Sequence, residues 1–189
     1  MPSTFRIPKA RISGLFGALM SVYARRRWGA IPDNGFVLWH NRRVLRTTLA
    51  LENGAARWNA LDPALSTYAQ MATAGAIGCS WCLDFGYFEA RGRGLELAKV
   101  REVPRWRESE AFSELERDVM AYAEAMTATP PAVTDALTAR LLEAIGPAAM
   151  VELTQVIALE NMRSRFNSAA GLESQGFSDV CELPLAERA

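Results

Sequence analysis

The apolar residues of this chain recur every three to four positions, and no stretch alternates between apolar and polar residues as a half-buried strand would. The first stretch, residues 12–23, places its large apolar side chains on one helical face: Ile12, Leu15, Phe16, Leu19, Val22 and Tyr23. Because this run is too short to cross a bilayer and Arg25-Arg26-Arg27 follows it, it predicts an amphipathic helix docked on the body or on a neighbouring subunit.

Helix start and stop signals divide the rest of the chain. Asp62-Pro63 and Ser113-Glu114-Leu115-Glu116 are typical helix N-termini, whereas Gly54 and Gly146 mark helix ends. The pattern predicts further helices over about 36–53, 62–75, 78–91, 113–126, 134–145 and 147–166. We therefore expect an all-α fold, a compact bundle of six or seven helices. It should form one domain over residues 1–189, with an N-terminal helix and arm in 1–30 and an irregular tail in 172–189.

Composition narrows the class of protein further. A chain of 189 residues that is 50% hydrophobic can bury a substantial core within one domain. Its 21 basic and 21 acidic residues cancel, so no net charge favours nucleic acid or an anionic membrane as a partner. Three cysteines are too few for a disulfide scaffold, which indicates a reducing compartment, and we expect the cytoplasm. No phosphate-binding glycine loop follows a strand, and no organic cofactor or metal is indicated.

The pair Cys79 and Cys82, in Gly78-Cys79-Ser80-Trp81-Cys82, carries the clearest chemistry in the sequence. On a helix the two thiols are one turn apart and can form a disulfide with each other. The first turn of a helix favours a thiolate, which is the form that attacks a peroxide or a disulfide. Such chemistry needs an attacking thiolate, a resolving thiol and usually a base, and the pair supplies the first two.

Three other interpretations of the pair remain open. Cys79, Cys82, Cys181 and His40 are formally sufficient for a Cys₃His zinc site, although structural zinc usually joins two close pairs of ligands, and His40 and Cys181 are isolated in sequence. The two cysteines are alternatively small buried residues without reactivity. The third interpretation is a non-enzymatic, oligomeric redox sensor in which oxidation of the pair changes helix packing.

The cysteine motif after an alanine-rich helix, together with the later helix ending in Leu159-Glu160-Asn161-Met162-Arg163-Ser164-Arg165-Phe166-Asn167, resembles the carboxymuconolactone decarboxylase family, and within it the alkylhydroperoxidase D branch. The resemblance implies an all-α protein that forms obligate homo-oligomers. It also implies a thiol peroxidase that takes a hydroperoxide as substrate and a thiol or dithiol as reductant. By this resemblance Cys82 attacks the peroxide and Cys79 resolves the product. A muconolactone decarboxylase is the alternative within the family, but that branch does not depend on a C-x-x-C pair.

The sequence also departs from that branch, whose members carry a proton relay. A histidine stands four residues after the second cysteine and a glutamate twelve before the first, and this chain has Gly86 and Thr67 there. Another group must then activate Cys82. Glu89 lies on the same helical face as Cys82, and His40 could approach the pair in the fold, so both are candidate catalytic residues.

Several polar residues remain as secondary candidates. Glu160, Asn161 and Arg165 lie inside the last predicted helix, where burial would make them part of a pocket and exposure would make them a solvated face. Cys181 is either a third redox partner on a mobile tail or a bystander thiol. Its neighbours Asp179 and Glu182 disfavour a thiolate at Cys181.

Overall fold

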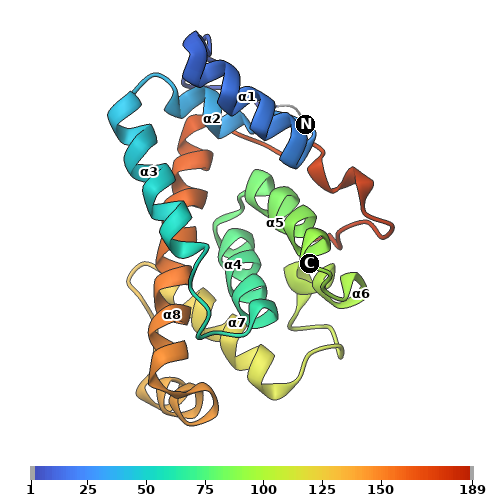
Figure 1. Cartoon of the computed structure of the whole chain (residues 1–189). Helices are drawn as coiled ribbons and strands as arrows, with labels where there is room; N and C mark the ends of the chain where they lie inside the picture. The colour runs from blue at the N-terminus through green and yellow to red at the C-terminus, as the bar shows by residue number, and fades with distance from the viewer. Residues whose placement is uncertain (1–2, 188–189) are drawn as a thin grey trace.

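The computed structural model describes residues 3–187, and in this range the chain is all-helical, without a strand. The predicted all-α fold is therefore confirmed, with eight α-helices rather than six or seven (Figure 1). The helices are α1 (Gly14–Trp28), α2 (Asp33–Leu38), α3 (Arg42–Ala55), α4 (Pro63–Ile77), α5 (Ser80–Gly92), α6 (Leu97–Val100), α7 (Glu114–Thr127) and α8 (Asp135–Ala170). Two short 3-10 helices, η1 (Val103–Arg105) and η2 (Phe177–Val180), complete the described elements. The ends of the predicted domain, residues 1–2 and 188–189, lie outside the described residues.

The helix count differs from the prediction at three places. The helix expected over 36–53 is interrupted, because Asn41 caps a new helix, with its side-chain oxygen accepting from the amides of Arg43 and Val44. The helices expected over 134–145 and 147–166 form one element, α8, with a kink at Gly146, whose φ of 74° is left-handed. The short α6 lacks a periodic apolar pattern long enough to predict it.

The predicted N-termini are found where side chains cap them. Asp62 accepts hydrogen bonds from the amides of Ala64 and Leu65 at the start of α4. Ser113 and Glu116 form a capping box at the start of α7. Local sequence therefore fixes where these helices begin, independently of the packing that follows.

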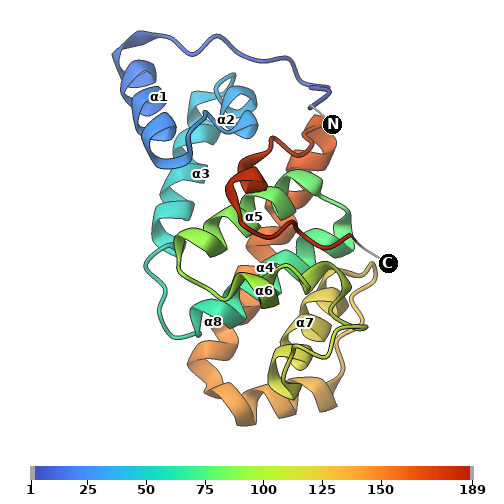
Figure 2. The ribbon, with the colours of Figure 1, turned by 90° about the vertical axis from the view of Figure 1, so that its right-hand side faces the viewer.

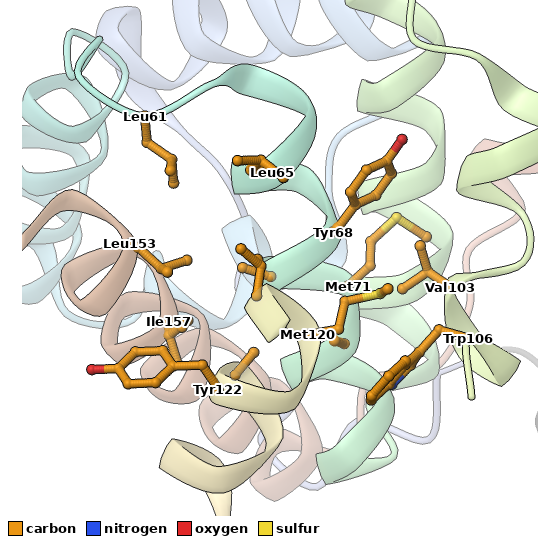
Figure 3. Packing of buried hydrophobic residues seen from close by; sticks show 14 of the residues in the cluster. Leu61, Leu65, Tyr68, Met71, Val103, Trp106, Met120, Tyr122, Leu153 and Ile157 are labelled. Atoms are coloured by element: carbon orange, nitrogen blue, oxygen red, sulfur yellow. The ribbon is translucent and has the colours of Figure 1, made fainter. Parts of the chain in front are cut away.

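Helix α4 is the centre of the bundle and packs against α5, α7 and α8 (Figures 1 and 2). Its alanines allow close approach of its neighbours, since Ala69, Ala72 and Ala74 are all almost fully buried. Figure 3 shows the larger core side chains around α4, contributed mostly by α4 itself, α7 and α8: Leu61, Leu65, Tyr68, Met71, Val103, Trp106, Met120, Tyr122, Leu153 and Ile157. Met71, Met120 and Met150 are buried in this core, where their flexible side chains fill the space between helices.

Helix α8 is long and apolar enough, by length and composition alone, to cross a membrane. However, its kink at Gly146 divides it, and it packs along α4 and α7 with Leu153 and Ile157 fully buried (Figure 3). These contacts make α8 a core helix of the bundle.

Both ends of the chain lie against the α5–α8 region. The N-terminal arm, residues 3–13, runs past the end of α8, where the amides of Thr4 and Arg6 donate to the carbonyls of Gly171 and Ala170. The C-terminal segment, residues 172–187, crosses α5 (Figure 2). It is largely irregular, with η2 as its helical turn.

Helix α1 leaves most of its apolar face uncovered. The exposed fractions of Leu15 and Leu19 are 80% and 61%, and Phe16, Val22 and Tyr23 are also exposed. Its attachment to the body is at its two ends, where Phe16 stacks on Trp39 and Trp28 packs against Phe85. The sequence led us to expect that the apolar face of this helix docks on the body of the chain or on a neighbouring subunit. The first of these two expectations is wrong, because the face is exposed.

Candidate active site at the cysteine pair

The cysteines lie at the junction of α4 and α5. Helix α4 ends at Gly78, whose φ of 81° is a left-handed conformation that favours glycine. The amides of Gly78 and Cys79 both donate to the carbonyl of Ala74, which closes α4. The chain then reverses directly into α5, with Cys79 as the N-cap residue and Cys82 in the first turn.

Cys79 and Cys82 form a disulfide in this structure, as the one-turn spacing allows. The Sγ of Cys79 also accepts a hydrogen bond from the amide of Cys82 at 3.2 Å. This amide is one of the N–H groups at the start of a helix that have no carbonyl partner within the helix, and negative charge is stabilised beside such groups. After reduction, the same geometry favours a thiolate at Cys79.

Cys82 has a different polar partner, Asn167 from the last turns of α8. The Nδ2 of Asn167 lies 3.4 Å from the Sγ of Cys82, and both residues are buried. The side-chain Oδ1 of Asn167 is buried without a hydrogen-bond partner among the described residues. Sequence reasoning missed Asn167, although it is the last residue of the motif on which the family resemblance rests. Its position seven residues after Glu160, on the same helical face, is the signal that could have found it.

The remaining neighbours of the pair are mostly apolar. The buried cluster that contains both cysteines also contains Val37, Ala74, Trp81, Ala170, Leu172 and Phe177. Trp81 stacks on Phe85 with ring centroids 5.0 Å apart, and Phe177 packs edge-on against both. The exposed fractions are 1% for Cys79 and 8% for Cys82, so the disulfide is nearly closed to solvent.

Asp84 anchors the C-terminal segment over this site. Its carboxylate accepts hydrogen bonds from the amides of Gln175, Phe177 and Ser178 and from the Ser178 hydroxyl, at 2.7–3.1 Å. Asp84 is itself buried. A buried carboxylate with several donors holds its loop firmly, so residues 175–178 cover the site in this disulfide form.

The two positions that depart from the relay pattern are occupied in the packing of α4 against α5. A Cβ on Gly86 would lie 3.2 Å from the Cγ of Met71, a buried residue of α4, so any side chain here requires the Met71 side chain to shift. Thr67 is buried too, and its hydroxyl donates to the Pro63 carbonyl and accepts from Arg93. Both positions therefore take part in the packing and hydrogen bonding of α4 and α5.

The two activators suggested by the sequence have partners elsewhere. Glu89 accepts hydrogen bonds from the indole N–H of Trp28 and from Arg27, both at 3.0 Å, and so ties α5 to α1. His40 is exposed, and its Nε2 lies 2.8 Å from the Pro8 carbonyl in the N-terminal arm. The structure thus brings Cys79 and Cys82 together and gives Glu89 and His40 contacts outside the pair.

Glu160 belongs to a buried polar group on α8. Its carboxylate accepts from the Ser164 hydroxyl at 2.7 Å and from Arg163 at 3.2 Å, and Arg163 in turn pairs with Glu52 and Gln70. Burial raises the pKa of Glu160, while Arg163 and the hydrogen bond from Ser164 oppose that rise. Glu160 and Ser164 lie on the same face of α8 as Asn167, in the two turns before it.

The other secondary candidates have structural contacts. Asn161 donates to the Thr127 hydroxyl and Arg165 to the Thr127 carbonyl, so both join α8 to the end of α7. Cys181 is partly buried, and burial raises the pKa of its thiol. Within residues 3–187 no group of three or more His, Cys, Asp or Glu side chains is arranged to hold a metal ion, so the four formal zinc ligands do not form a cluster.

Comparison with known sequences places this site in a family. The sequence model of the carboxymuconolactone decarboxylase family matches residues 42–125, which include both cysteines. The uncharacterized protein YnjA of Escherichia coli (strain K12) is 34% identical over 164 residues, which cover 84% of this chain and 81% of YnjA.

Solved structures share the fold over nearly the whole chain. The debrominase Bmp8 superposes with a TM-score of 0.81 and 18% identity, covering 94% of this chain and 96% of Bmp8. A peroxidase-related protein from Ralstonia eutropha JMP134, with an alkylhydroperoxidase AhpD core, superposes with a TM-score of 0.78 and 14% identity, covering 93% of this chain and 97% of that protein. At these identities the similarity establishes an AhpD-like helical fold.

Proposed function

This chain belongs to the carboxymuconolactone decarboxylase family, and from that premise we propose that it is a thiol-dependent hydroperoxide reductase that uses Cys79 and Cys82. The observation that carries the proposal is the disulfide at the N-terminus of α5, in which one sulfur accepts a helix amide and the other faces the Asn167 amide. Two thiols that can close on each other, one of them at a helix N-terminus, suit two-electron reduction of a peroxide.

The proposed reaction starts from the reduced pair. The Cys82 thiolate attacks one oxygen of the hydroperoxide, the O–O bond breaks, and the alcohol leaves after taking a proton, so that Cys82 becomes a sulfenic acid. The Cys79 thiolate then attacks the Cys82 sulfur, and hydroxide leaves as water after taking a second proton. The resulting disulfide is the state of this structure. An external thiol or dithiol returns two electrons and two protons and restores the pair.

The contacts of the two sulfurs support this division of roles. Cys82 is the less buried of the two, which favours it as the sulfur that meets substrate. Cys79 is almost fully buried and accepts the Cys82 amide, which suits a resolving thiolate that attacks only its neighbour. Glu89 and His40, which we expected as catalytic residues from the sequence, contact α1 and the N-terminal arm instead, and we assign no step to them.

The surroundings of the pair favour an organic hydroperoxide over hydrogen peroxide. Trp81, Phe85 and Phe177 form an apolar aromatic group beside the sulfurs, and a hydrocarbon substituent gains free energy when it leaves water for such a surface. Because both sulfurs are buried in the disulfide form, we expect residues 172–180 to move when substrate or reductant reaches them.

We also propose that the protein works as a homo-oligomer in the cytoplasm. The apolar face of α1, centred on Leu15 and Leu19, is exposed, and a contiguous exposed apolar face is typical of an interaction surface. Charge is divided in a way that favours self-association, since residues 1–57 hold ten of the 21 basic residues and two of the 21 acidic residues. The basic α1 region of one copy would therefore meet an acidic body in another.

A second candidate function is reductive removal of a halogen. It is favoured by the similarity to debrominase Bmp8, which covers 94% of this chain, and by the stacked aromatic rings of Trp81 and Phe85 beside Cys82. The two thiols would supply two electrons and two protons: one proton replaces bromine on carbon, bromide leaves, the second proton passes to water, and the disulfide forms. A decarboxylase function has no specific contact in its favour.

The test of the proposed function is turnover by the reduced protein. We expect the wild type to consume cumene hydroperoxide continuously with dithiothreitol as reductant, and Cys82→Ser to abolish this consumption. Cys79→Ser should react with one equivalent and leave a sulfenic acid at Cys82 that dimedone traps, detected by mass spectrometry. Cys181→Ser is the matched control, and it should turn over like the wild type. Equal consumption by wild type and Cys82→Ser would contradict the proposal.

The same proteins distinguish the alternatives. If reduced wild type releases bromide from 2,3,4-tribromopyrrole and forms the Cys79–Cys82 disulfide, but leaves cumene hydroperoxide unchanged, dehalogenation replaces peroxide reduction. If neither substrate is turned over and peroxide only forms the disulfide once, the pair acts as a redox sensor.

A further inference from the structure

Asn167 is in an unusual environment for a side-chain amide. It is 1% exposed, its Nδ2 points to the Sγ of Cys82 at 3.4 Å, and its Oδ1 has no hydrogen-bond partner in the described part of the chain. Within residues 3–187 the Nε of Arg101 is the one other buried side-chain nitrogen or oxygen that has no hydrogen-bond partner. A buried amide oxygen without a partner costs about 1–3 kcal/mol, so its presence calls for a physical reason.

We propose that Asn167 is a catalytic residue that stabilises the Cys82 thiolate and takes the place of the absent relay histidine. This inference rests on the proposed function, in which Cys82 is the attacking sulfur. The Nδ2–H group donates to the sulfur when it carries no proton, and a hydrogen bond to a charged acceptor is about twice as strong as one to a neutral acceptor. The contact therefore favours the thiolate over the thiol.

The partnerless oxygen fits the same role. When Cys82 is a protonated thiol, its S–H needs an acceptor, and the amide can turn so that Oδ1 accepts it. When Cys82 is a thiolate or part of a disulfide, Nδ2 faces the sulfur and Oδ1 is left without a partner, which is the arrangement observed. An amide has both a donor and an acceptor, so one side chain serves both protonation states of Cys82.

Asn167 is held in place by the end of α8. Its backbone carbonyl accepts the amide of Leu172, and the C-cap residue Gly171 is bonded in turn to Thr4 of the N-terminal arm. The last carbonyls of α8, at Ser168 and Ala169, accept from the guanidinium of Arg6, which reduces the negative charge that a helix C-terminus presents. The amide therefore faces Cys82 from a fixed backbone.

The groups around Cys82 leave the thiolate with few other stabilising contacts. In the shared buried cluster, α4 contributes Ala74, α2 contributes Val37, α8 contributes Ala170, and the C-terminal segment contributes Leu172 and Phe177, all without charge. On α5 itself, the titratable neighbour of Cys82 is Cys79, the N-cap residue. The positive end of the α5 dipole also lies at this first turn.

The charged residues of the packed elements face other partners. Asp33 of α2 pairs with Lys9. On α5, Asp84 binds the C-terminal segment and Glu89 binds α1. Glu160 of α8 binds Ser164 and Arg163. Arg165 donates to Thr127. Since burial among apolar groups raises the pKa of a thiol, a direct donor to the sulfur has a large effect on Cys82.

The experiment measures the pKa of Cys82 itself. In the Cys79→Ser/Cys181→Ser background Cys82 is the remaining thiol, and its ionisation is followed by thiolate absorbance near 240 nm as the pH is raised. Asn167→Leu has nearly the same volume and no donor, so we expect the pKa to rise by about one to two units. At pH 7 the alkylation rate of Cys82 should fall roughly tenfold or more, because the thiolate fraction falls.

Two further variants make the result decisive. Asn167→Asp keeps the shape and polarity, and its carboxylate should raise the Cys82 pKa as well, by repulsion, so it serves if the leucine variant does not fold. Asn161→Leu is the matched control, because it removes an asparagine from the same helix that binds Thr127 and not the sulfur. It should leave the Cys82 pKa unchanged.

The outcomes separate this inference from the proposed function. If folded Asn167→Leu and Asn167→Asp, shown by circular dichroism, both titrate like their parent, Asn167 has no such role, even if the enzyme reduces peroxide. An equal rise in Asn161→Leu would likewise overturn the proposal, since the effect would then be structural. If the wild type fails to reduce peroxide but the Asn167 variants raise the pKa as expected, the function fails and the role of Asn167 toward the thiolate stands.

Discussion

Two helices of this protein, α1 and α5, both carry apolar side chains on one side, and the structure treats them in opposite ways. Helix α5 is enclosed, with α4 on one side, the end of α8 against its first turn and the C-terminal segment across it (Figures 1 and 2). Helix α1 is held mainly at its ends and leaves Leu15 and Leu19 in water.

The difference lies in the polar anchors that each helix offers. Helix α5 has Asp84, which binds three amides and a hydroxyl of the C-terminal segment, and Glu89, which binds Trp28. The corresponding stretch of α1 has no acidic residue, and its last turn is Arg25-Arg26-Arg27. An apolar face becomes a closed site where directional hydrogen bonds fix a cover over it, and becomes an association surface where they do not.

The largest effect on stability is expected from removal of the anchor at Asp84. Asp84→Ala leaves three amides and a hydroxyl without their acceptor, so the free energy of unfolding should fall by about 3 kcal/mol. Denaturant titration measures this loss, and hydrogen exchange should accelerate in residues 175–178. Asp84→Asn keeps one acceptor oxygen and should lose less. If exchange in the cover did not change in Asp84→Ala, the contrast between α5 and α1 would need another cause.

A smaller loss is expected when the relay histidine is restored at Gly86. Because a Cβ there already approaches Met71 at 3.2 Å, Gly86→His must displace the buried Met71 side chain, and we expect a loss of about 2 kcal/mol in denaturant titration. Gly86→Ala is the control. Its gain in helix propensity of about 1 kcal/mol offsets a small shift of Met71. A Gly86→His protein as stable as the wild type, with faster peroxide turnover, would show that the helix packing does not exclude the relay.

A substitution on the exposed face of α1 is expected to have the smallest effect on the stability of the fold. It should nevertheless change the assembly of the protein. Leu19→Glu puts a charge on a residue that is 61% exposed, so hydrogen exchange in α4 and α5 should match the wild type. The molar mass from light scattering should fall at least twofold if α1 is the interface between copies. Val151→Glu alters an apolar residue of α8 that is 71% exposed and should keep the wild-type mass. An equal fall in both variants would remove the distinction assigned to α1.

The sequence predicted most of the helices because their signals are local. Caps at Asp62 and Ser113 determine where helices begin through hydrogen bonds within a few residues. The end of α4 was predicted near residue 75, and the structure places it at Ile77, before Gly78. The one-turn spacing of Cys79 and Cys82 is equally local, and it made the disulfide predictable. The break at Asn41 was missed because the apolar spacing continued through it.

The partners of the cysteines could not be predicted in this way. Asn167 lies 85 residues from Cys82, and the cover over α5 comes from about ninety residues later than Asp84. Sequence reasoning proposed Glu89 because it shares a face with Cys82, but that face also meets α1, where Trp28 and Arg27 bind it. His40 was proposed because it is the one histidine, and it lies at the Pro8 carbonyl.

The sequence by itself determined the all-α class, the family and the position of the thiol pair at the start of a helix, because helix periodicity, capping and i,i+3 spacing act over one or two turns. Tertiary structure decided which groups surround those thiols. It packs Met71 close to Gly86, places Asn167 at Cys82 and leaves the apolar face of α1 uncovered. These are contacts between segments far apart in the chain, and they depend on how whole helices pack.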